Sequence, residues 1–165
     1  NPKSFIYFIN AGTNEKMVGC IVADKNTKCI LASLFGKGFV VETIHLISNQ
    51  RNGKQIFNLK TNDKLTKVIE CDKPNVAITN TSGKLLIFEI NSLPVLQKGG
   101  GVQLIKIKDK DLLSDIQIIN IAEGISWQTG SKIRSLIDIK YWIGKRAQSG
   151  KKVPKFFNKN IRFSD

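Results

Sequence analysis

Residues 29–42 read CILASLFGKGFVVE, and residues 76–89 read VAITNTSGKLLIFE. Gly36 and Gly83, 47 residues apart, occupy the same place in the two segments, and each is followed by a lysine. Short apolar runs on both sides of a glycine turn are typical of a β-hairpin. A hairpin that returns at this interval predicts a repeat protein, because the interval matches the length of one four-stranded propeller blade.

The repeat extends along the chain. Residues 53–60 (GKQIFNLK) return as residues 101–108 (GVQLIKIK), 48 residues later. We therefore expect an all-β fold, a propeller-like array of four-stranded blades that forms a single repeat domain. Its expected units are a partial blade (1–28), two blades (29–75 and 76–123), a second partial blade (124–149) and a basic C-terminal tail (150–165). These are about three blades, fewer than the ~4–8 of a closed propeller, so we expect a fragment of a larger ring or an open array with exposed strand edges.

Other short runs of β-branched and aromatic residues predict further strands. They lie at residues 5–9, 55–59, 104–107 and 116–121. Residues 138–144 (DIKYWIG) could form a strand or a helical turn, and the pattern does not decide between them.

The chain is strongly basic. It carries 26 lysines and arginines against 13 acidic residues, a net charge of +13. Residues 132–165 hold ten of the basic residues and only two acids, Asp138 and Asp165. Such an excess favours a polyanionic partner, because cations that neutralise phosphates release counterions. A solvated tail and a phosphate-binding surface are the two interpretations of the C-terminal cluster.

Several classes of site receive no support. Cys20, Cys29 and Cys71 lie in or beside apolar runs without metal or redox spacing, which predicts buried thiols in a reducing cytoplasm. His45 is the single histidine, so a histidine triad or a multi-histidine metal site is not expected. No apolar run reaches the ~18–20 residues of a membrane span. Since no nucleotide-binding glycine motif is present, we expect neither nucleotide hydrolysis nor a cofactor in this chain.

The string QKGGGV at residues 97–102 is the most suggestive local feature, and QRNGK at residues 50–54 occupies the equivalent place one repeat earlier. Glycines beside basic residues let amide groups and cationic side chains approach a phosphate together. Glycine-rich connections between strands also serve as plain turns. Both interpretations stay open from the string alone.

The blade-length interval, the SGK hairpin and the QKGGG string resemble the C-terminal domains of bacterial type II topoisomerase A subunits. Residues 138–150 (DIKYWIGKRAQSG), preceded by GISW at 124–127, resemble the end of the topoisomerase IV members in particular. The resemblance covers essentially the whole chain. It implies a β-pinwheel, a propeller-like fold with strands exchanged between neighbouring blades, and DNA bound and bent around a basic outer rim.

Gyrase A subunits carry a box of the form QRRGG(K/R)G that wraps DNA tightly, and residues 97–103 match it in part. Gly99 stands at the second basic position, Val102 at the later basic position, and Gln103 at the closing glycine. The incomplete box resembles topoisomerase IV more than gyrase, and it argues against strong wrapping of DNA.

The resemblance also implies a division of labour. The family's catalytic tyrosine lies in a separate upstream domain, so Tyr7 and Tyr141 are not expected to be nucleophiles; we expect Tyr141 and Trp142 to pack in the core. The chain should be non-catalytic on its own, with ATP and Mg²⁺ used by other domains of the whole enzyme. Its implied role is to bind and bend double-stranded DNA and to orient a segment for strand passage in relaxation and decatenation. Its other implied partners are the ATPase B subunit and the rest of the A subunit. The implied location is the cytoplasm, at the nucleoid, and peripheral membrane association of the whole enzyme is left open.

Cations and glycines at blade turns and outer strands are the expected DNA contacts, because they would neutralise phosphates along a bent duplex. They are Lys37, Arg51, Lys54, Lys84, Lys98, Gly99, Gly100, Gly101, Lys132, Arg134, Lys145 and Arg146. The main alternative is a propeller that binds an acidic protein partner. An RNA-binding all-β module fits less well, because the repeats lack paired aromatics on adjacent strands. A hydrolase fits least, because no convergent acid–base pair is visible.

Overall fold

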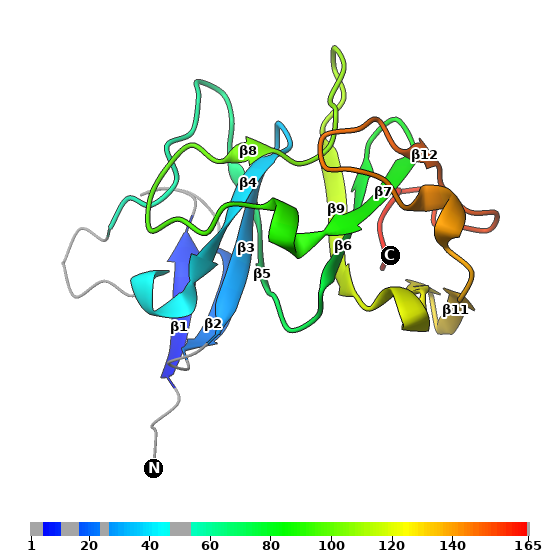
Figure 1. Cartoon of the computed structure of the whole chain (residues 1–165), viewed down its shortest axis with the longest axis horizontal. Helices are drawn as coiled ribbons and strands as arrows, with labels where there is room; N and C mark the ends of the chain where they lie inside the picture. Colours follow the sequence, from blue (N-terminus) through cyan, green and yellow to red (C-terminus); the bar gives the residue numbers. More distant parts are fainter. Residues whose placement is uncertain (1–4, 11–16, 24–26, 47–53, 165) are drawn as a thin grey trace. The chain divides into compact units, whose positions relative to one another are not determined.

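The computed structural model describes residues 5–10, 17–23, 27–46 and 54–164, and for residues 5–23 it describes the backbone alone. The described chain is built from short antiparallel strands and single turns of 3-10 helix (Figure 1). It divides into two compact units. Unit 1 comprises Asn1–Asp72 and Leu93–Val102, and unit 2 comprises Lys73–Ser92 and Gln103–Asp165.

Unit 1 is organised around one four-stranded sheet in the order β5-β3-β4-β8, with β1 and β2 paired in a separate hairpin. Its elements are β1 (Phe5–Asn10), β2 (Met17–Ala23), β3 (Lys28–Ser33), β4 (Lys37–Glu42), η1 (Thr43–Leu46), β5 (Leu65–Glu70) and β8 (Val102–Gln103). The second residue of β8, Gln103, is assigned to unit 2.

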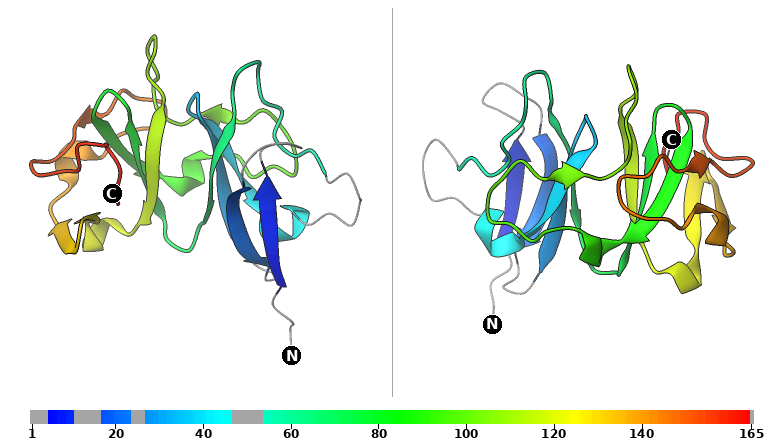
Figure 2. Two further views of the ribbon diagram at one scale, coloured as in Figure 1. Left: turned by 180° about the vertical axis from the view of Figure 1, so that it is seen from behind. Right: turned by 45° about the horizontal axis from the view of Figure 1, so that its top comes forward.

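Unit 2 repeats this sheet in the order β9-β6-β7-β12 and adds a hairpin of β10 and β11. Strands β6, β7 and β9 lie side by side in both Figure 1 and Figure 2. The elements are β6 (Asn75–Asn80), β7 (Lys84–Glu89), η2 (Ile90–Ser92), β9 (Leu113–Ile119), η3 (Ile121–Glu123), β10 (Ile125–Thr129), β11 (Lys132–Leu136), η4 (Lys140–Trp142) and β12 (Lys151–Lys152).

The outer strand of each four-stranded sheet arrives from far along the chain. Strand β8 joins β4 only after the β6–β7 hairpin has been completed, and β12 joins β7 only after the β10–β11 hairpin. Both connections begin with a parallel bridge to the second strand of the earlier hairpin, Val40 to Val95 and Ile87 to Ile143. Each sheet is therefore completed by a strand exchanged from beyond the next hairpin, as the resemblance to a β-pinwheel implies.

The inner strands are apolar because both of their faces are covered. All six residues of β6 are buried, and five of the six residues of β3 are buried. Strands covered on both faces read as continuous apolar runs rather than alternating ones. This explains why CILA and VAIT in the two repeats carry no polar alternation.

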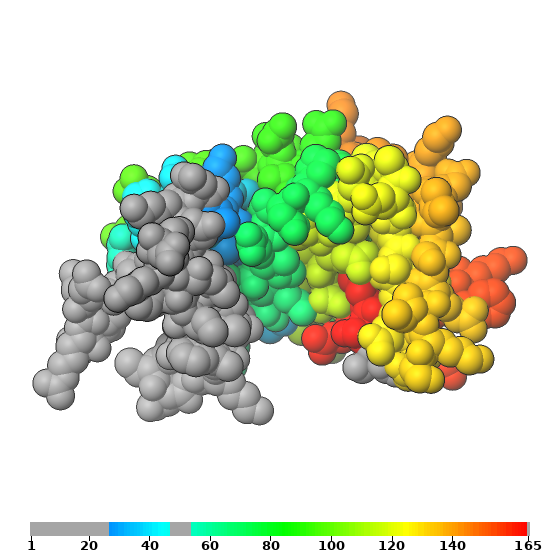
Figure 3. Space-filling model, turned by 90° about the horizontal axis from the view of Figure 1, so that it is seen from below, coloured from blue at the N-terminus to red at the C-terminus, as the bar shows by residue number. Residues whose placement is uncertain are grey.

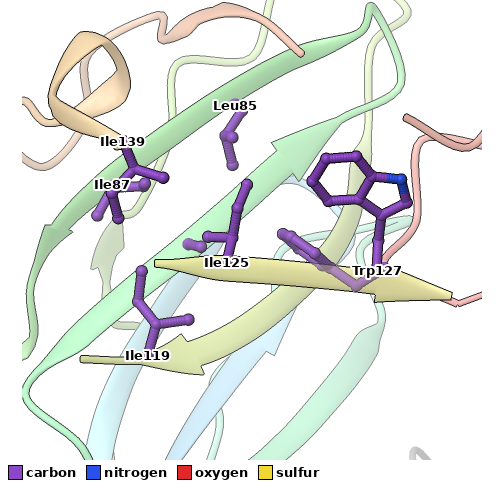
Figure 4. Close-up of a cluster of buried hydrophobic side chains, with 8 residues drawn as sticks. Leu85, Ile87, Ile119, Ile125, Trp127 and Ile139 are labelled. Carbon is purple, nitrogen blue, oxygen red and sulfur yellow. The ribbon is translucent and has the colours of Figure 1, made fainter. Parts of the chain in front are cut away.

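The core of unit 2 includes the C-terminal residues. Leu85 and Ile87 of β7 pack with Ile119, Ile125 and Trp127 in one cluster (Figure 4). Phe163 belongs to the same cluster, and its backbone N–H donates to the buried carboxylate of Asp115 at 2.8 Å. In Figure 3 the red C-terminal residues lie beside the yellow residues of β10. The sequence left the order of the tail open. Of its three phenylalanines, the structure buries Phe163 in the core, packs Phe157 against it and leaves Phe156 exposed.

Two of the expected strands are not strands. Residues 55–59 make a single bridge, Phe57 to Gly99, and residues 104–107 lie outside the sheets although Leu104 and Ile105 are fully buried. Both segments hydrogen-bond to irregular connections rather than to a neighbouring strand, so their apolar character reflects burial without sheet pairing. Residues 138–144, left undecided by the sequence, contain the 3-10 turn η4. Within the described residues, no helix has the length and apolar character needed to cross a bilayer.

Candidate nucleic-acid interface

The hairpin turns place a lysine at the start of the second strand of each repeat. The turn glycines have φ of 82° and 87°, a left-handed conformation that a residue with a side chain adopts at a cost. The N–H of Lys37 donates to Ser33 Oγ at 3.2 Å, and the N–H of Lys84 donates to Asn80 Oδ1 at 3.1 Å. The two turns are thus built alike, and both lysines are half-buried.

The connection that carries the QKGGG string, here called exchange loop 1 (residues 93–102), is fixed by its backbone. Its first turn bonds to β4, with Val40 N donating to Pro94 O and Leu96 N donating to Val40 O. Gly99 then exchanges two hydrogen bonds with the segment around Phe57 (Gly99 N to Ile56 O at 3.0 Å, Asn58 N to Gly99 O at 2.8 Å). These bonds leave Lys98 and Gly100 exposed and Gly99 half-buried.

Exchange loop 2 (residues 143–151) repeats the same bonding one blade later. Gly144 N donates to Ile87 O at 2.8 Å. Two further bonds, from Ala147 N to Leu104 O at 2.9 Å and from Lys106 N to Gln148 O at 3.0 Å, match those made by Gly99 in the first loop. The sequence segments RAQSGKK (146–152) and QKGGGVQ (97–103) therefore hold equivalent positions, although they share few residues.

Each exchange loop ends in a glycine that touches the strand beside it. Gly101 has φ of 73°, and a β-carbon there would lie 2.6 Å from the carbonyl oxygen of Gly38. Gly150 has φ of 72°, and a β-carbon there would lie 2.6 Å from the carbonyl oxygen of Leu85. The last glycine of the QKGGG string, Gly101, is thus required for close approach of two backbones, while Lys98, three residues earlier, is exposed.

Strand β12 brings two further lysines next to β7 in unit 2. Lys152 lies directly opposite Lys84 in the antiparallel β7–β12 pair, and Lys151 lies opposite Leu85. Like charges placed directly opposite one another destabilise a sheet. Lys145 in exchange loop 2 is exposed as well. The start of β7, exchange loop 2 and β12 thus carry four lysines in unit 2: Lys84, Lys145, Lys151 and Lys152.

The sequence did not single out Lys151 and Lys152. The signal was present, because residues 148–152 stand 49 positions after residues 99–103, which contain β8. The lysine-rich composition from Gly150 onward, which is typical of a tail, obscured this repeat.

The two expected arginines in unit 2 have partners within the fold. Arg146 is half-buried and donates from Nη1 to Gln103 O at 2.8 Å and from Nε to Ser92 O at 3.2 Å, so its guanidinium braces exchange loop 2. The guanidinium of Arg134 lies 5.0 Å from the centre of the Phe156 ring, a cation–π arrangement on an exposed surface. Lys132 and Lys54 are exposed, and Arg51 lies outside the described residues.

The expectation that Tyr141 packs in the core is wrong, while the expectation for Trp142 is right. Trp142 packs against the cluster of unit 2 and donates from Nε1 to Lys152 O at 2.8 Å. Tyr141 is 59% exposed, with the Lys151 ammonium 4.2 Å from its ring centre. The 3-10 turn directs these neighbouring side chains to different environments, which a strand-like or apolar pattern does not reveal.

Among the residues that the structure describes, no ion pair joins a candidate cation to an acidic side chain. The ion pair recorded there joins Lys73 to Glu123 at 4.0 Å, outside the turns and exchange loops. The same residues contain no group of three or more histidine, cysteine or acidic side chains arranged to hold a metal ion.

Four-stranded sheets that exchange their outer strands define a β-propeller-like repeat protein of the pinwheel type. The chain belongs to the family described as DNA gyrase C-terminal domain, beta-propeller, whose model matches residues 28–72 and 74–120. The two matched segments correspond to the two repeats. The expected all-β, propeller-like fold and the expected family are thereby confirmed.

Curated relatives are named as the A subunit of DNA topoisomerase 4. The relative from Rickettsia bellii is 36% identical over 162 residues, which cover 98% of this chain and 22% of the relative. That from Rickettsia felis is 34% identical with the same coverage, and that from Caulobacter vibrioides is 34% identical over 82% of this chain and 18% of the relative. The chain thus spans about a fifth of the length of these proteins.

Solved structures support the fold. The C-terminal domain of Escherichia coli ParC aligns with a TM-score of 0.74 at 20% identity, covering 88% of this chain and 63% of that domain. The C-terminal domain of DNA gyrase A aligns with a TM-score of 0.64 at 19% identity, covering 89% of this chain and 52% of that one.

Proposed function

We propose that this chain is a non-catalytic domain of a type II topoisomerase A subunit that binds and bends double-stranded DNA. It captures a DNA segment and orients it for strand passage during relaxation and decatenation. Cleavage and ATP hydrolysis, with their Mg²⁺, belong to other parts of the enzyme, namely the ATPase B subunit, together with the rest of the A subunit. The site of action is the nucleoid, in the cytoplasm.

The observation that carries this proposal is the Lys84–Lys152 pair. The fold places two lysines opposite one another, adds Lys151 beside them, and gives none of the three a carboxylate among the described residues. Such repulsion reduces stability unless a polyanion neutralises it. In unit 1, the equivalent loop carries its own exposed cation, Lys98.

Bending is proposed on the resemblance to the family, with equivalent loops that carry cations in successive repeats. Smooth bending of a 20–30 base-pair site costs roughly 1–6 kcal/mol, which the additional phosphate contacts offset. The cations are mainly lysines, which act as point charges rather than bidentate readers of bases, so binding should depend little on base sequence.

The test is duplex affinity measured over a salt series. For a 30 base-pair duplex, log affinity should fall linearly with log salt, by about 0.9 for each phosphate neutralised. The double variant Lys145→Gln/Lys152→Gln should lower that slope by about 2. Its matched control, Lys110→Gln/Lys159→Gln, removes the same charge from exposed positions of unit 2 outside the exchange loops and hairpin turns, and should lower the slope less.

Two outcomes would contradict the proposal. Absence of duplex binding at 50 mM salt would favour the alternative of a module for an acidic protein. Relaxation or cleavage of supercoiled DNA by this chain alone would show that it is catalytic. Bending is read separately, from the end-to-end distance of a doubly labelled duplex, which should shorten when the chain binds.

A further inference from the structure

Among the described residues, the last hairpin of the chain, β10–β11, has no outer strand of the kind that completes the β3–β4 and β6–β7 hairpins. In the four-stranded sheets, β4 is flanked by β8, and β7 is flanked by β12. Strand β11 holds the corresponding place in its hairpin, yet within the described residues it pairs with β10 alone. Its outer edge is therefore open in the part of the chain that the structure describes.

The register shows which backbone groups point to this edge. On β10, the N–H of Ser126 bonds to Gln117 Oε1 and the N–H of Gln128 bonds to Phe163 O, so both residues direct their backbone groups away from β11. Residues directly opposite in an antiparallel pair share one bonding type. Ser135 and Ile133, the partners of Ser126 and Gln128, therefore direct their N–H and C=O groups to the outer edge of β11. These groups can accept a further strand.

A hollow of about 590 Å³ lies beside this edge. Its lining includes the rings of Trp127, Trp142 and Phe156. Both indole N–H groups are already satisfied, Trp127 Nε1 by Phe156 O and Trp142 Nε1 by Lys152 O. The two tryptophans therefore offer apolar ring surface to a ligand rather than a polar group. The hollow lies entirely within unit 2.

Phe156 is held in an unfavourable state at this hollow. It has φ of 65° and is 74% exposed, although bulky residues rarely adopt positive φ and aromatic side chains favour burial. Ile133, at 73% exposed, lies on the open strand. Phe156 on the hollow side of the open strand and Ile133 on its other face thus leave exposed apolar surface beside the edge, which is characteristic of an interaction surface.

The rim of the hollow is cationic. Arg134, Lys152 and Lys155 line it, and Lys132 is exposed on the same strand as Arg134 and on the same face, two residues away. A segment that added to β11 would place alternate side chains over the hollow. An apolar residue facing the rings, with acidic residues two positions to either side, matches this surface in both polarity and charge.

We propose that β11 docks an extended acidic segment of a partner protein as an added strand, with an apolar side chain of that segment seated in the aromatic hollow. The rim cations alone would suit DNA equally well. The strand edge and the ring-lined hollow favour a peptide, because they match a backbone ladder and a side-chain anchor. The site shares the cations Lys152 and Arg134 with the DNA-binding role proposed above. It differs from that role in its anchors, which are the open edge of β11 and the hollow rather than the exchange loops.

The probe is a blocked nine-residue peptide with a central phenylalanine, glutamates at two and four residues to either side, and threonines between. It should bind the 165-residue chain, change the tryptophan fluorescence, and slow amide hydrogen exchange at Ile133 and Ser135. A version with lysine in place of each glutamate should bind at least tenfold more weakly. A version N-methylated at alternate residues cannot form the backbone hydrogen bonds to β11, so it should also bind at least tenfold more weakly.

Matched variants separate docking from folding. Ser135→Pro removes an outward N–H and should weaken the peptide at least tenfold, whereas Ser135→Ala keeps that N–H and should bind as the unchanged chain does. Arg134→Glu should weaken binding much more than Lys110→Glu, which makes the same charge change away from the hollow. Circular dichroism and urea unfolding establish that each variant is folded before binding is scored.

Any of four results would overturn the proposal: no binding of the acidic peptide, equal binding of the N-methylated peptide, equal loss in Arg134→Glu and Lys110→Glu, or protection of the same two amides by duplex DNA in place of the peptide. Self-association of the chain that protects Ile133 and Ser135 would assign the edge to a second copy instead. Loss of peptide binding with unchanged duplex affinity in Ser135→Pro would leave the DNA-binding proposal standing, so the two can fail separately.

Discussion

The carbonyl oxygen of Leu85 occupies the space that a side chain at Gly150 would need. A β-carbon on Gly150 would lie 2.6 Å from that oxygen and 2.8 Å from the carbonyl carbon, both backbone atoms of β7. This contact holds β12 against β7 and closes the second four-stranded sheet. The equivalent contact between Gly101 and Gly38 does the same for the first.

Replacing Gly150 by alanine should therefore detach β12. The new methyl group meets backbone that cannot move without breaking the β6–β7 ladder, and positive φ adds strain of order 1–3 kcal/mol. Gly130→Ala is the matched control, because Gly130 also has positive φ (60°) but a β-carbon there would meet nothing within 4 Å. Urea unfolding should show a clearly larger loss of stability for Gly150→Ala. Equal losses would mean that the close approach to Leu85 contributes nothing.

The Lys84–Lys152 pair predicts a conflict between stability and DNA binding. Removing one charge in Lys152→Gln should raise the free energy of unfolding by about 0.2–1 kcal/mol at low salt, because like charges opposite one another are destabilising. The same change should weaken duplex binding. The gain in stability should shrink with added salt, as screening requires. A variant that lost stability at low salt would show that Lys152 is compensated by a partner.

The hairpins could be predicted from sequence because their determinants are local. A turn glycine followed by lysine, flanked by apolar runs, is sufficient to place β3–β4 and β6–β7. The strand exchange could not be predicted from the residues alone, since the pairing of β12 with β7 depends on contacts between residues more than sixty positions apart. The glycine string at residues 97–101 shows the difficulty, because a flexible turn and a backbone contact such as that of Gly101 use the same residue type.

For the candidate site, the repeat predicts where its lysines lie in the fold, and their role in binding stays a prediction. Lysines at the turns and in exchange loop 1 lie where the repeat predicted them, at the starts of inner strands and in the connection before β8. The sequence could not show which of these side chains are hydrogen-bonded or buried within the fold. Arg146 reads as a surface cation, but two backbone carbonyls hold it. Phe163 lies in a lysine-rich tail, but it completes a core.

Substitutions of the adjacent residues Arg146 and Lys145 should have different effects, the first on stability and the second on DNA binding. Arg146→Ala removes charge-assisted hydrogen bonds to Ser92 O and Gln103 O and should lower the free energy of unfolding by about 1.5–3 kcal/mol. Lys145→Ala should change stability by less than about 0.5 kcal/mol, because the side chain is exposed. In duplex binding, Lys145→Ala should reduce the salt slope by about 1. The assignment fails if the stability effects of the two variants are reversed.

Cys71 should make the stability of the fold sensitive to alkaline pH. Burial, with a smaller contribution from nearby Cys29, raises the pKa of Cys71 from 9.0 to about 12. Above pH 9 the unfolded chain therefore releases the thiol proton while the folded chain retains it, so the free energy of unfolding falls as pH rises, by at most about 1.4 kcal/mol per unit for one group. Urea unfolding of the reduced protein at pH 8–10, compared with Cys71→Ala, isolates this effect because lysine titration is common to both. The unchanged chain should lose more stability than the variant over this range, and parallel curves would show that the thiol does not remain protonated in the fold.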